Sequence, residues 1–344
     1  MAEEKNKVVE IIETCMVVPD KETPKHRLWL SNLDLFNHKD HAPTFYLYKP
    51  NGNPNDFFSV ETLKKALGKA LVTFYPLAGR LSLDEDGRLE VDCNAEGALF
   101  SVASAHCTVE GFGDFRPSPA VRQLLVPSVT EAERSSILML FQLNTLKHGF
   151  NGERDLSTFK AVAVHLWRTA CKARGLADEQ DTRLFVIADA RAWLQPPLPA
   201  GYLGNAVVRV SANLQVGELV SKPFELGVAK IEETTNMVDD EYLRSFVDLL
   251  EKVKCDKKLL MDSRGIKRTD FYVVSWLTLP IYEADFGWGK PWFMGRASMR
   301  CIGHAYLKRT PGDSSGGVTV TLAFETGNMP RFKEIFYSDL DSHV

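Results

Sequence analysis

Apolar residues near the start of the chain predict two strands. Residues 6–18 are rich in β-branched side chains and are bounded by Pro19, which is typical of a strand followed by a break. Residues 43–48 predict a second strand that is buried on at least one face. Both segments are short apolar runs between turn-forming residues, so the chain opens with sheet structure.

The next segment changes to helical spacing. From Ser59 to Thr73 the apolar positions recur every three or four residues, which predicts a helix that ends near Tyr75 and Pro76. The sequence Asp84-Glu85-Asp86-Gly87 then predicts a hairpin between two strands, because Asp-Gly suits the backbone of a tight turn.

Strands and helices continue to alternate through the rest of the chain, which indicates an α/β protein. The short apolar run at residues 136–141 predicts a central strand, and a polar stretch between Gln142 and Asp155 predicts a domain boundary. Amphipathic spacing predicts a long helix over residues 156–174. The other expected elements are strands at 183–188, 271–277 and 317–324 and a helix at 238–251.

Composition narrows the class of protein. The chain has 344 residues, enough for two domains, and a net charge of −4, which provides no global attraction for nucleic acid or an anionic membrane surface. No apolar run reaches the roughly 20 residues that span a bilayer, and the polar start is unlike a secretory signal. Six cysteines lie scattered without C-x-x-C spacing, so we expect a cytoplasmic protein with free thiols and no bound metal.

Common catalytic signatures are missing from the sequence. There is no phosphate-binding G-x-x-x-x-G-K, no G-x-S-x-G and no H-E-x-x-H. His165 lies within the predicted helix at 156–174, where a packed core histidine is favoured over a catalytic one. The cluster His38-Lys39-Asp40-His41 is read as an exposed loop in preference to a site.

Several segments together resemble the BAHD acyltransferases, plant enzymes that move acyl groups from coenzyme A thioesters to alcohols or amines. The most specific is Asp285-Phe286-Gly287-Trp288-Gly289-Lys290-Pro291, which is similar to the family signature. The resemblance covers nearly the whole chain and is strongest toward hydroxycinnamoyl-CoA transferases. The other matching segments are residues 75–81, 92–97, 165–176 and 197–205.

The resemblance implies a two-domain chloramphenicol-acetyltransferase-like fold with mixed sheets and a shortened N-terminal domain. The N-terminal domain is expected over 1–142 and the C-terminal domain, with the signature motif, over 143–344. The implied activity belongs to plant secondary (phenylpropanoid) metabolism, with acyl-CoA as co-substrate and no further cofactor. We expect a monomer whose partners are a small acyl-CoA donor and an amine or alcohol acceptor.

One departure concerns catalysis. In the family, the histidine of a His-x-x-x-Asp motif takes the proton of the acceptor, but no histidine here precedes an aspartate by four residues; His106 with Glu110 is the nearest match. The motif should follow Gln142, where Leu143 to Lys147 instead resembles a helix that the family places later. The comparison implies that the better part of a hundred residues is absent there, and we expect little or no acyl transfer.

A second departure concerns the acceptor. Members that use shikimate or quinate grip a carboxylate with an arginine, and Thr278 stands at that position in Ser275-Trp276-Leu277-Thr278-Leu279-Pro280. Ala42 likewise replaces a common threonine, although Thr44 and Tyr46 keep polar tips. Thr44, Tyr46 and Thr278 are therefore candidates for a pocket that takes an amine or a non-acidic alcohol, with purely structural roles as the alternative.

The resemblance assigns further roles by position. Ser157 and Lys172 are candidates for binding coenzyme A, with solvated surface as the alternative. Arg191, Asp285, Phe286, Gly287, Trp288 and Gly289 are expected to be structural, with an Asp285–Arg191 ion pair and a packed Trp288. The competing hypothesis for the whole chain is a non-catalytic truncated paralogue or splice form.

Overall fold

The structure, a computed structural model, describes residues 9–36, 40–49, 57–108, 116–147, 159–253, 267–299, 301–310 and 317–341. The chain divides into two compact units, each built from segments that are distant in sequence. Unit 1 comprises Met1–Ser31, Asn37–Gly152 and Pro280–Ser298. Unit 2 comprises Asn32–Phe36, Glu153–Leu279 and Met299–Val344.

These units differ from the expected division at residues 142 and 143. The expected boundary falls inside strand β7 (Leu140–Lys147), which pairs along its length with β6 (Ala98–Thr108). The signature motif at residues 285–289 belongs to unit 1, whereas the sequence placed it in the C-terminal domain. The physical reason is strand pairing, because β11 (Phe293–Arg296), just beyond the motif, is antiparallel to β3 (Thr44–Leu47).

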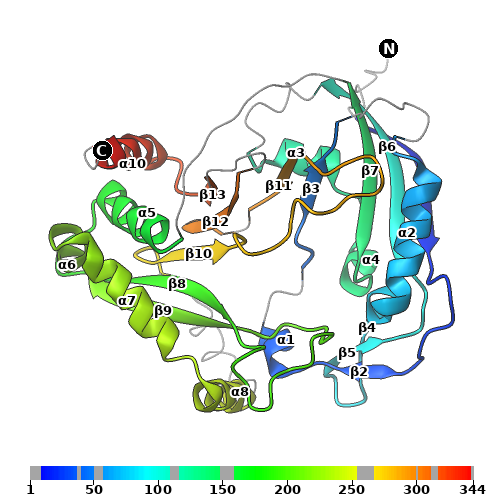
Figure 1. Cartoon of the computed structure of the whole chain (residues 1–344), viewed down its shortest axis with the longest axis horizontal. Coiled ribbons are helices and arrows are strands. Elements are labelled where there is room, and N and C mark those ends of the chain that lie inside the picture. The colour runs from blue at the N-terminus through cyan, green and yellow to red at the C-terminus, as the bar shows by residue number, and fades with distance from the viewer. Residues whose placement is uncertain are drawn as a thin grey trace. The chain divides into compact units, whose positions relative to one another are not determined.

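The described residues of unit 1 form three small sheets with the strand orders β1-β6-β7, β11-β3 and β2-β5-β4, and Figure 1 shows these strands. β1 runs antiparallel to β6, and β7 runs parallel to it. The remaining elements of the unit are β1 (Val9–Val17), β2 (Arg27–Trp29), α2 (Val60–Thr73), the 3-10 helix η1 (Tyr75–Ala78), β4 (Arg80–Leu83), β5 (Leu89–Asp92), α3 (Pro119–Leu125) and α4 (Glu131–Ser136).

Helix α2 packs on the sheet that contains β1 and β6. Its N-terminus is capped by Ser59, whose hydroxyl accepts the backbone N–H of Thr62. Leu71 is fully buried against Val17 and Phe100 of the two strands. The expected hairpin is also present, since β4 and β5 pair antiparallel around Gly87, whose φ is +74°.

The strand expected at 136–141 is displaced toward the C-terminus. Residues up to Ser136 belong to α4, whose capping box at Thr130 and Glu133 favours the helix, and the strand begins at Leu140. β7 is an edge strand of its sheet, not a central one. The helix-like reading of residues 143–147 is wrong, because Leu143 and Asn144 continue the parallel register opposite Val102 and Ala103.

Unit 2 contains a mixed five-stranded sheet in the order β13-β12-β10-β8-β9. Helices α5, α7 and α10 contribute to one large apolar core with this sheet. The elements are α1 (Asn32–Phe36), α5 (Phe159–Arg174), β8 (Asp181–Asp189), β9 (Val207–Gln215), α6 (Val216–Ser221), α7 (Phe224–Asn236), α8 (Asp240–Val253), β10 (Phe271–Ser275), β12 (His304–Arg309), β13 (Val318–Ala323) and α10 (Met329–Asp341).

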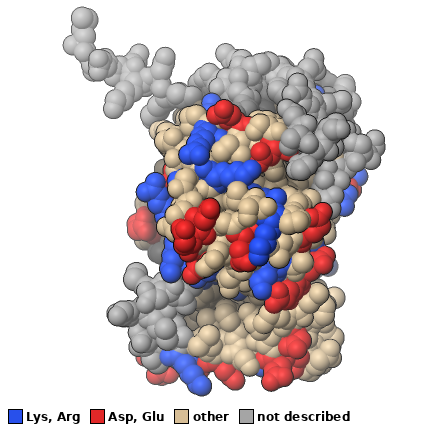
Figure 2. All heavy atoms as spheres, turned by 90° about the vertical axis from the view of Figure 1, so that its left-hand side faces the viewer, with Lys and Arg blue, Asp and Glu red and all other residues tan. Residues whose placement is uncertain are grey.

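The core of unit 2 is organised around α5, as its amphipathic spacing predicts. Trp167 is completely buried and its indole N–H donates to the Thr182 hydroxyl at 2.8 Å. His165 is 91% buried, and its Nε2 lies 2.8 Å from the Phe336 carbonyl, which agrees with the core reading. On the face shown in Figure 2, basic and acidic side chains are interspersed. In the described part of the chain, no helix is long and apolar enough to cross a membrane.

Candidate active site

Two of the predicted acceptor-pocket residues share one face of β3. Thr44 and Tyr46 alternate with the buried residues Phe45 and Leu47, so their side chains leave the strand on its exposed face. Across the strand pair, Thr44 lies opposite Arg296 and Tyr46 opposite Met294. The structure therefore places Thr44 and Tyr46 on one face of β3 in unit 1, and their role in an acceptor pocket stays a prediction.

The tyrosines of this segment are neutral hydrogen-bonding groups at physiological pH. Burial raises the pKa of Tyr46 above its ordinary value, and burial raises that of Tyr48 to about 12. The Tyr48 hydroxyl donates to the Ala284 carbonyl at 2.9 Å, which ties β3 to the chain just before the signature motif. Tyr46 is 38% exposed and Tyr48 is half-buried, so Tyr46 is the more accessible of the two tyrosines.

The third pocket candidate, Thr278, lies in a turn after β10 and is exposed. The turn is held by Arg309, whose Nε donates to the Leu277 carbonyl at 2.7 Å. Thr278 belongs to unit 2, whereas Thr44 and Tyr46 belong to unit 1. The grouping of the three residues in one pocket therefore stays a prediction.

The signature motif folds back on its own aspartate. Oδ1 of Asp285 accepts the backbone N–H of Gly287 at 2.8 Å and that of Gly289 at 3.0 Å. Both glycines have a positive φ, +100° and +102°, which disfavours any side chain at these positions. The structural role expected for Asp285, Gly287 and Gly289 is consistent with this turn.

Trp288 is 95% buried within unit 1. Its ring lies 5.4 Å from that of Phe58 and 5.7 Å from that of Phe286, with Phe57 at 6.3 Å. No acceptor for its indole N–H is found among the described residues. Packing is thus the observed role of Trp288, and sequence reasoning missed its neighbours Phe57 and Phe58 because they lie 230 or more positions away in the chain.

The expected Asp285–Arg191 ion pair joins residues of different units and stays a prediction. Within unit 2, Arg191 has other partners, because it lies 3.1 Å from Asp189 and donates to the Gly204 carbonyl at 2.8 Å. Asp285 is engaged by its own motif. An ion pair between Asp285 and Arg191 would have to form beside the contacts that each residue makes within its own unit, or replace them.

Ser157 and Lys172 are the two residues that the resemblance assigns to the binding of coenzyme A. Ser157 lies outside the described residues. Lys172, on α5, forms an ion pair with Asp339 of α10 at 2.5 Å, and both side chains are about one-third exposed. Lys172 would have to exchange this partner to meet a phosphate, so its assignment stays a prediction.

The junction Gln142–Leu143 lies in β7, whose eight residues include no histidine, aspartate or glutamate. Both residues lie within β7, and the Gln142 amide donates to the Leu124 carbonyl at 3.1 Å and to Asn144 at 2.8 Å. His41, of the same unit, lies 2.8 Å from the Ile137 carbonyl through its Nε2. His148 and the side chain of His106 lie outside the described residues. No group of His, Cys, Asp and Glu in the described part of the chain could hold a metal ion.

Comparison with known proteins decides the family. A family model described as the Transferase family matches residues 7–152 and 140–339. The chain belongs to this family, the BAHD acyltransferases. By family it is a CoA-dependent acyltransferase, and the resemblance seen in its signature motifs is confirmed.

Relatives and solved structures agree with this membership. The chain is 35% identical to putrescine hydroxycinnamoyltransferase 1 of Oryza sativa subsp. japonica and 30% identical to shikimate O-hydroxycinnamoyltransferase of Nicotiana tabacum, each match covering 96% of this chain and 99% of the relative. Vinorine synthase has the same fold, with a TM-score of 0.71 at 17% identity over 94% of this chain and 96% of its own. The predicted two-domain α/β fold is therefore confirmed.

The comparisons also bear on the missing segment. The match to the rice BAHD enzyme spans 442 positions, whereas this chain has 344 residues, so at least 98 positions (442 − 344) have no residue opposite them here. Because 99% of the relative is covered, these positions fall inside the match rather than at its ends. The two pieces of the family match meet at residues 140–152, which include the expected junction.

Proposed function

We propose that this BAHD acyltransferase moves a hydroxycinnamoyl or similar group from a CoA thioester to an amine, or to an alcohol without a carboxylate. The observation that carries the proposal is Thr278 in place of the carboxylate-binding arginine. A threonine hydroxyl offers one donor and no charge, so it cannot form the bidentate contact that an arginine makes with a carboxylate. The identity of 35% to a putrescine hydroxycinnamoyltransferase supports an amine acceptor.

The missing histidine motif also favours an amine. An alcohol must lose its proton as it attacks a thioester, and general-base catalysis is worth about 10²–10⁴ in rate. A free amine attacks through its own lone pair and releases a proton afterwards. We propose that the chain retains more of the family activity toward amines than toward alcohols, and that both rates are low.

The remaining assignments complete the proposal. Thr44 and Tyr46 offer neutral hydroxyls to the acceptor, since burial raises the pKa of Tyr46 and keeps its phenol protonated. Ser157 and Lys172 contact the phosphates of coenzyme A, with Lys172 leaving Asp339 when the donor binds. The protein acts as a cytoplasmic monomer on small-molecule substrates.

The test is an acceptor comparison. Purified protein is incubated with p-coumaroyl-CoA and putrescine, shikimate or no acceptor, and released thiol and product are measured against a control without protein. The proposal expects amide formation with putrescine above the control and no ester with shikimate. Ester formation that exceeds amide formation would contradict it.

A second function is favoured by one specific observation, the absence of any histidine four residues before an aspartate. The chain would then be a non-catalytic derivative that still binds CoA thioesters. Thiol release equal to the control with every acceptor, together with measurable binding of coenzyme A by calorimetry, identifies this alternative.

A further inference from the structure

A cysteine, a lysine and a glutamate meet where β1 faces α2 in unit 1. Glu13, Cys15 and Val17 alternate along β1, so their side chains leave the strand on the same face. Lys64 of α2 donates to Oε1 of Glu13 at 2.6 Å. The hydrogen bond between them lowers the pKa of Glu13 and raises that of Lys64, and the nearby Cys15 thiol adds to both shifts.

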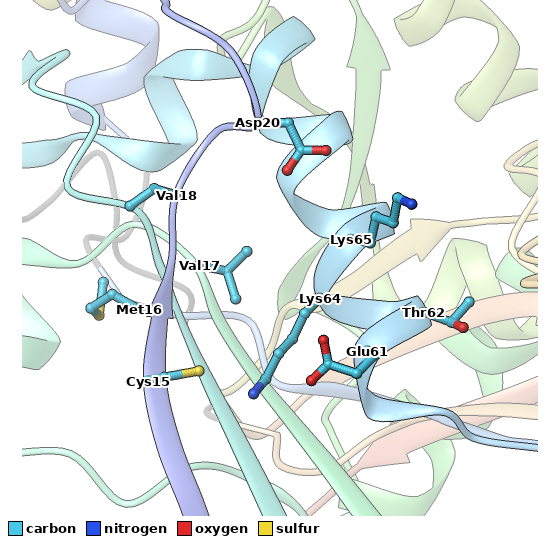
Figure 3. A pocket seen from close by; sticks show the side chains of 9 residues that line it. All are labelled: Cys15, Met16, Val17, Val18, Asp20, Glu61, Thr62, Lys64 and Lys65. Atoms are coloured by element: carbon cyan, nitrogen blue, oxygen red, sulfur yellow. The ribbon is translucent and has the colours of Figure 1, made fainter.

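The position of Lys64 is fixed by a second contact. Its ammonium lies over the ring of Phe100, 5.9 Å from the ring centre. Phe100 on β6 is the direct cross-strand neighbour of Cys15. The ammonium is thus anchored above the Cys15–Phe100 pair, and Figure 3 shows the side chains of Cys15 and Lys64 pointing toward one another.

This cluster opens into a cavity of about 640 Å³, lined by nine residues of β1, α2 and the chain after β1. That size is within the range of small-molecule sites. The lining includes the basic residues Lys64 and Lys65 and the acidic residues Asp20 and Glu61 (Figure 3). Val17 adds an apolar side chain on the face of β1 that carries Cys15, so the lining offers charged and apolar groups together.

Cys15 is more exposed than two of the other cysteines whose side chains are described. Cys93 and Cys171 are each 99% buried, and burial raises the pKa of both thiols, that of Cys171 to about 11. Cys301, in unit 2, is partly exposed, as Cys15 is. Cys301 is therefore a control thiol of similar exposure that lies outside the Cys15, Lys64 and Glu13 cluster.

We propose that Cys15 is a self-acylation site, at which the thiol takes the acyl group of a CoA thioester. The thiol gives its proton to solvent, and the sulfur attacks the thioester carbonyl carbon to form a new S–C bond. The Lys64 ammonium stabilises the oxyanion of the tetrahedral intermediate. The bond from that carbon to the coenzyme A sulfur then breaks, and the departing thiolate takes up a proton from solvent, so one thioester replaces another.

The electrostatics of Lys64 decide where the acyl group stays. The hydrogen bond to Glu13 raises the pKa of Lys64 above its ordinary value, so the amine remains protonated and cannot attack the new thioester. The adduct therefore stays on sulfur instead of moving to the lysine nitrogen. Hydroxylamine cleaves a thioester and leaves an amide intact, which separates the two products chemically.

The experiment is acceptor-free labelling of the full chain. Protein is incubated with p-coumaroyl-CoA, quenched in acid and analysed by intact mass and peptide mapping, with and without hydroxylamine. We expect one hydroxylamine-sensitive acyl group on Cys15. Lys64→Met should slow labelling at least about tenfold, because it removes a charge-assisted hydrogen bond, whereas Cys301→Ser should leave the rate unchanged. Thermal melting of each variant verifies that it is folded.

Peptide mapping of the wild-type chain keeps the proposal falsifiable even where a variant fails to fold. Label confined to another cysteine, an amide on Lys64, or no label at a hundredfold excess of the thioester would each overturn it. The proposal rests on the proposed function only in taking an acyl-CoA as the available thioester. If Cys15 is labelled but no acceptor is acylated, the proposed function is contradicted and this proposal stands. If an acceptor is acylated but Cys15 carries no label, this proposal is contradicted and the proposed function stands.

Discussion

Asp285 and Gly287 are joined by a short hydrogen bond, in which the backbone N–H of Gly287 donates to Oδ1 of Asp285 at 2.8 Å. Gly287 has φ at +100° and no atom within 4 Å of the place where a Cβ would stand. Any cost of a side chain there comes from the backbone and not from a clash. The signature motif is therefore a turn held by one carboxylate and two glycines.

We predict that Gly287→Ala destabilises the protein by about 1–2 kcal/mol, the usual cost of an L residue in a left-handed conformation. Thermal unfolding measures it. Gly327→Ala is the matched control, because Gly327 also has open space around it and lacks a positive φ. Equal melting temperatures for the two variants would show that the turn geometry is not required.

Thr278→Arg tests the origin of acceptor preference. Thr278 is exposed in its turn, so an arginine can be accommodated without repacking. We predict that the variant raises the ratio of shikimate ester to putrescine amide at least about tenfold, because a charge-assisted bidentate contact becomes available. Thr278→Lys should give a smaller rise, since an ammonium lacks the planar fork of a guanidinium. An unchanged product ratio in both variants would remove Thr278 from the pocket.

The pH dependence of turnover tests the proposed chemistry. An aliphatic amine has a pKa of about 10, so the fraction that carries a free lone pair grows about tenfold per pH unit near neutrality. We predict that amide formation rises with this slope between pH 7 and 9 and shows no plateau near the pKa of a histidine. A plateau beginning near pH 6.5 would indicate a histidine base.

Lys308 predicts a separate effect of pH on stability. It is 98% buried in β12, and burial lowers its pKa to about 8. Between pH 8 and the unfolded value of 10.5, the unfolded chain binds more protons than the folded chain, so the free energy of unfolding rises with pH. Below pH 8 both states are protonated and this gain is absent.

The stability of Lys308→Met relative to the wild type should therefore fall by roughly 2 kcal/mol between pH 7.5 and pH 10, since one pKa unit corresponds to about 1.4 kcal/mol. Urea unfolding at the two pH values measures the change. Lys333→Met, which removes an exposed lysine, is the control. A wild-type–variant difference that stays constant with pH would contradict the role of Lys308.

Local periodicity predicts much of this fold. Helices α2 and α5 and the β4–β5 hairpin lie where their spacing and turn residues place them, because each is determined by nearby residues. β7 was misplaced because its start depends on the α4 capping box and its extent on parallel pairing with β6, a strand about 40 positions away. Strand β12 was not predicted at all, since it mixes aromatic and charged side chains without a clear period.

The candidate site was predictable only in part. The exposed face of β3 follows from alternation, which brings Thr44 and Tyr46 together. The packing of Phe57 and Phe58 on Trp288 and the meeting of Cys15 with Lys64 depend on contacts between residues 49 or more positions apart. Sequence spacing carries no information about such pairs.

We propose, as the central claim, that the internal gap of this BAHD acyltransferase removes its general base. Its most direct test is the turnover number for p-coumaroyl-CoA and putrescine, measured at pH 7 beside rice putrescine hydroxycinnamoyltransferase 1, which has at least 98 positions that this chain lacks (442 − 344). The account predicts a turnover number lower by about 10²–10⁴, the contribution of general-base catalysis. A turnover number within tenfold of that of the rice enzyme would contradict it.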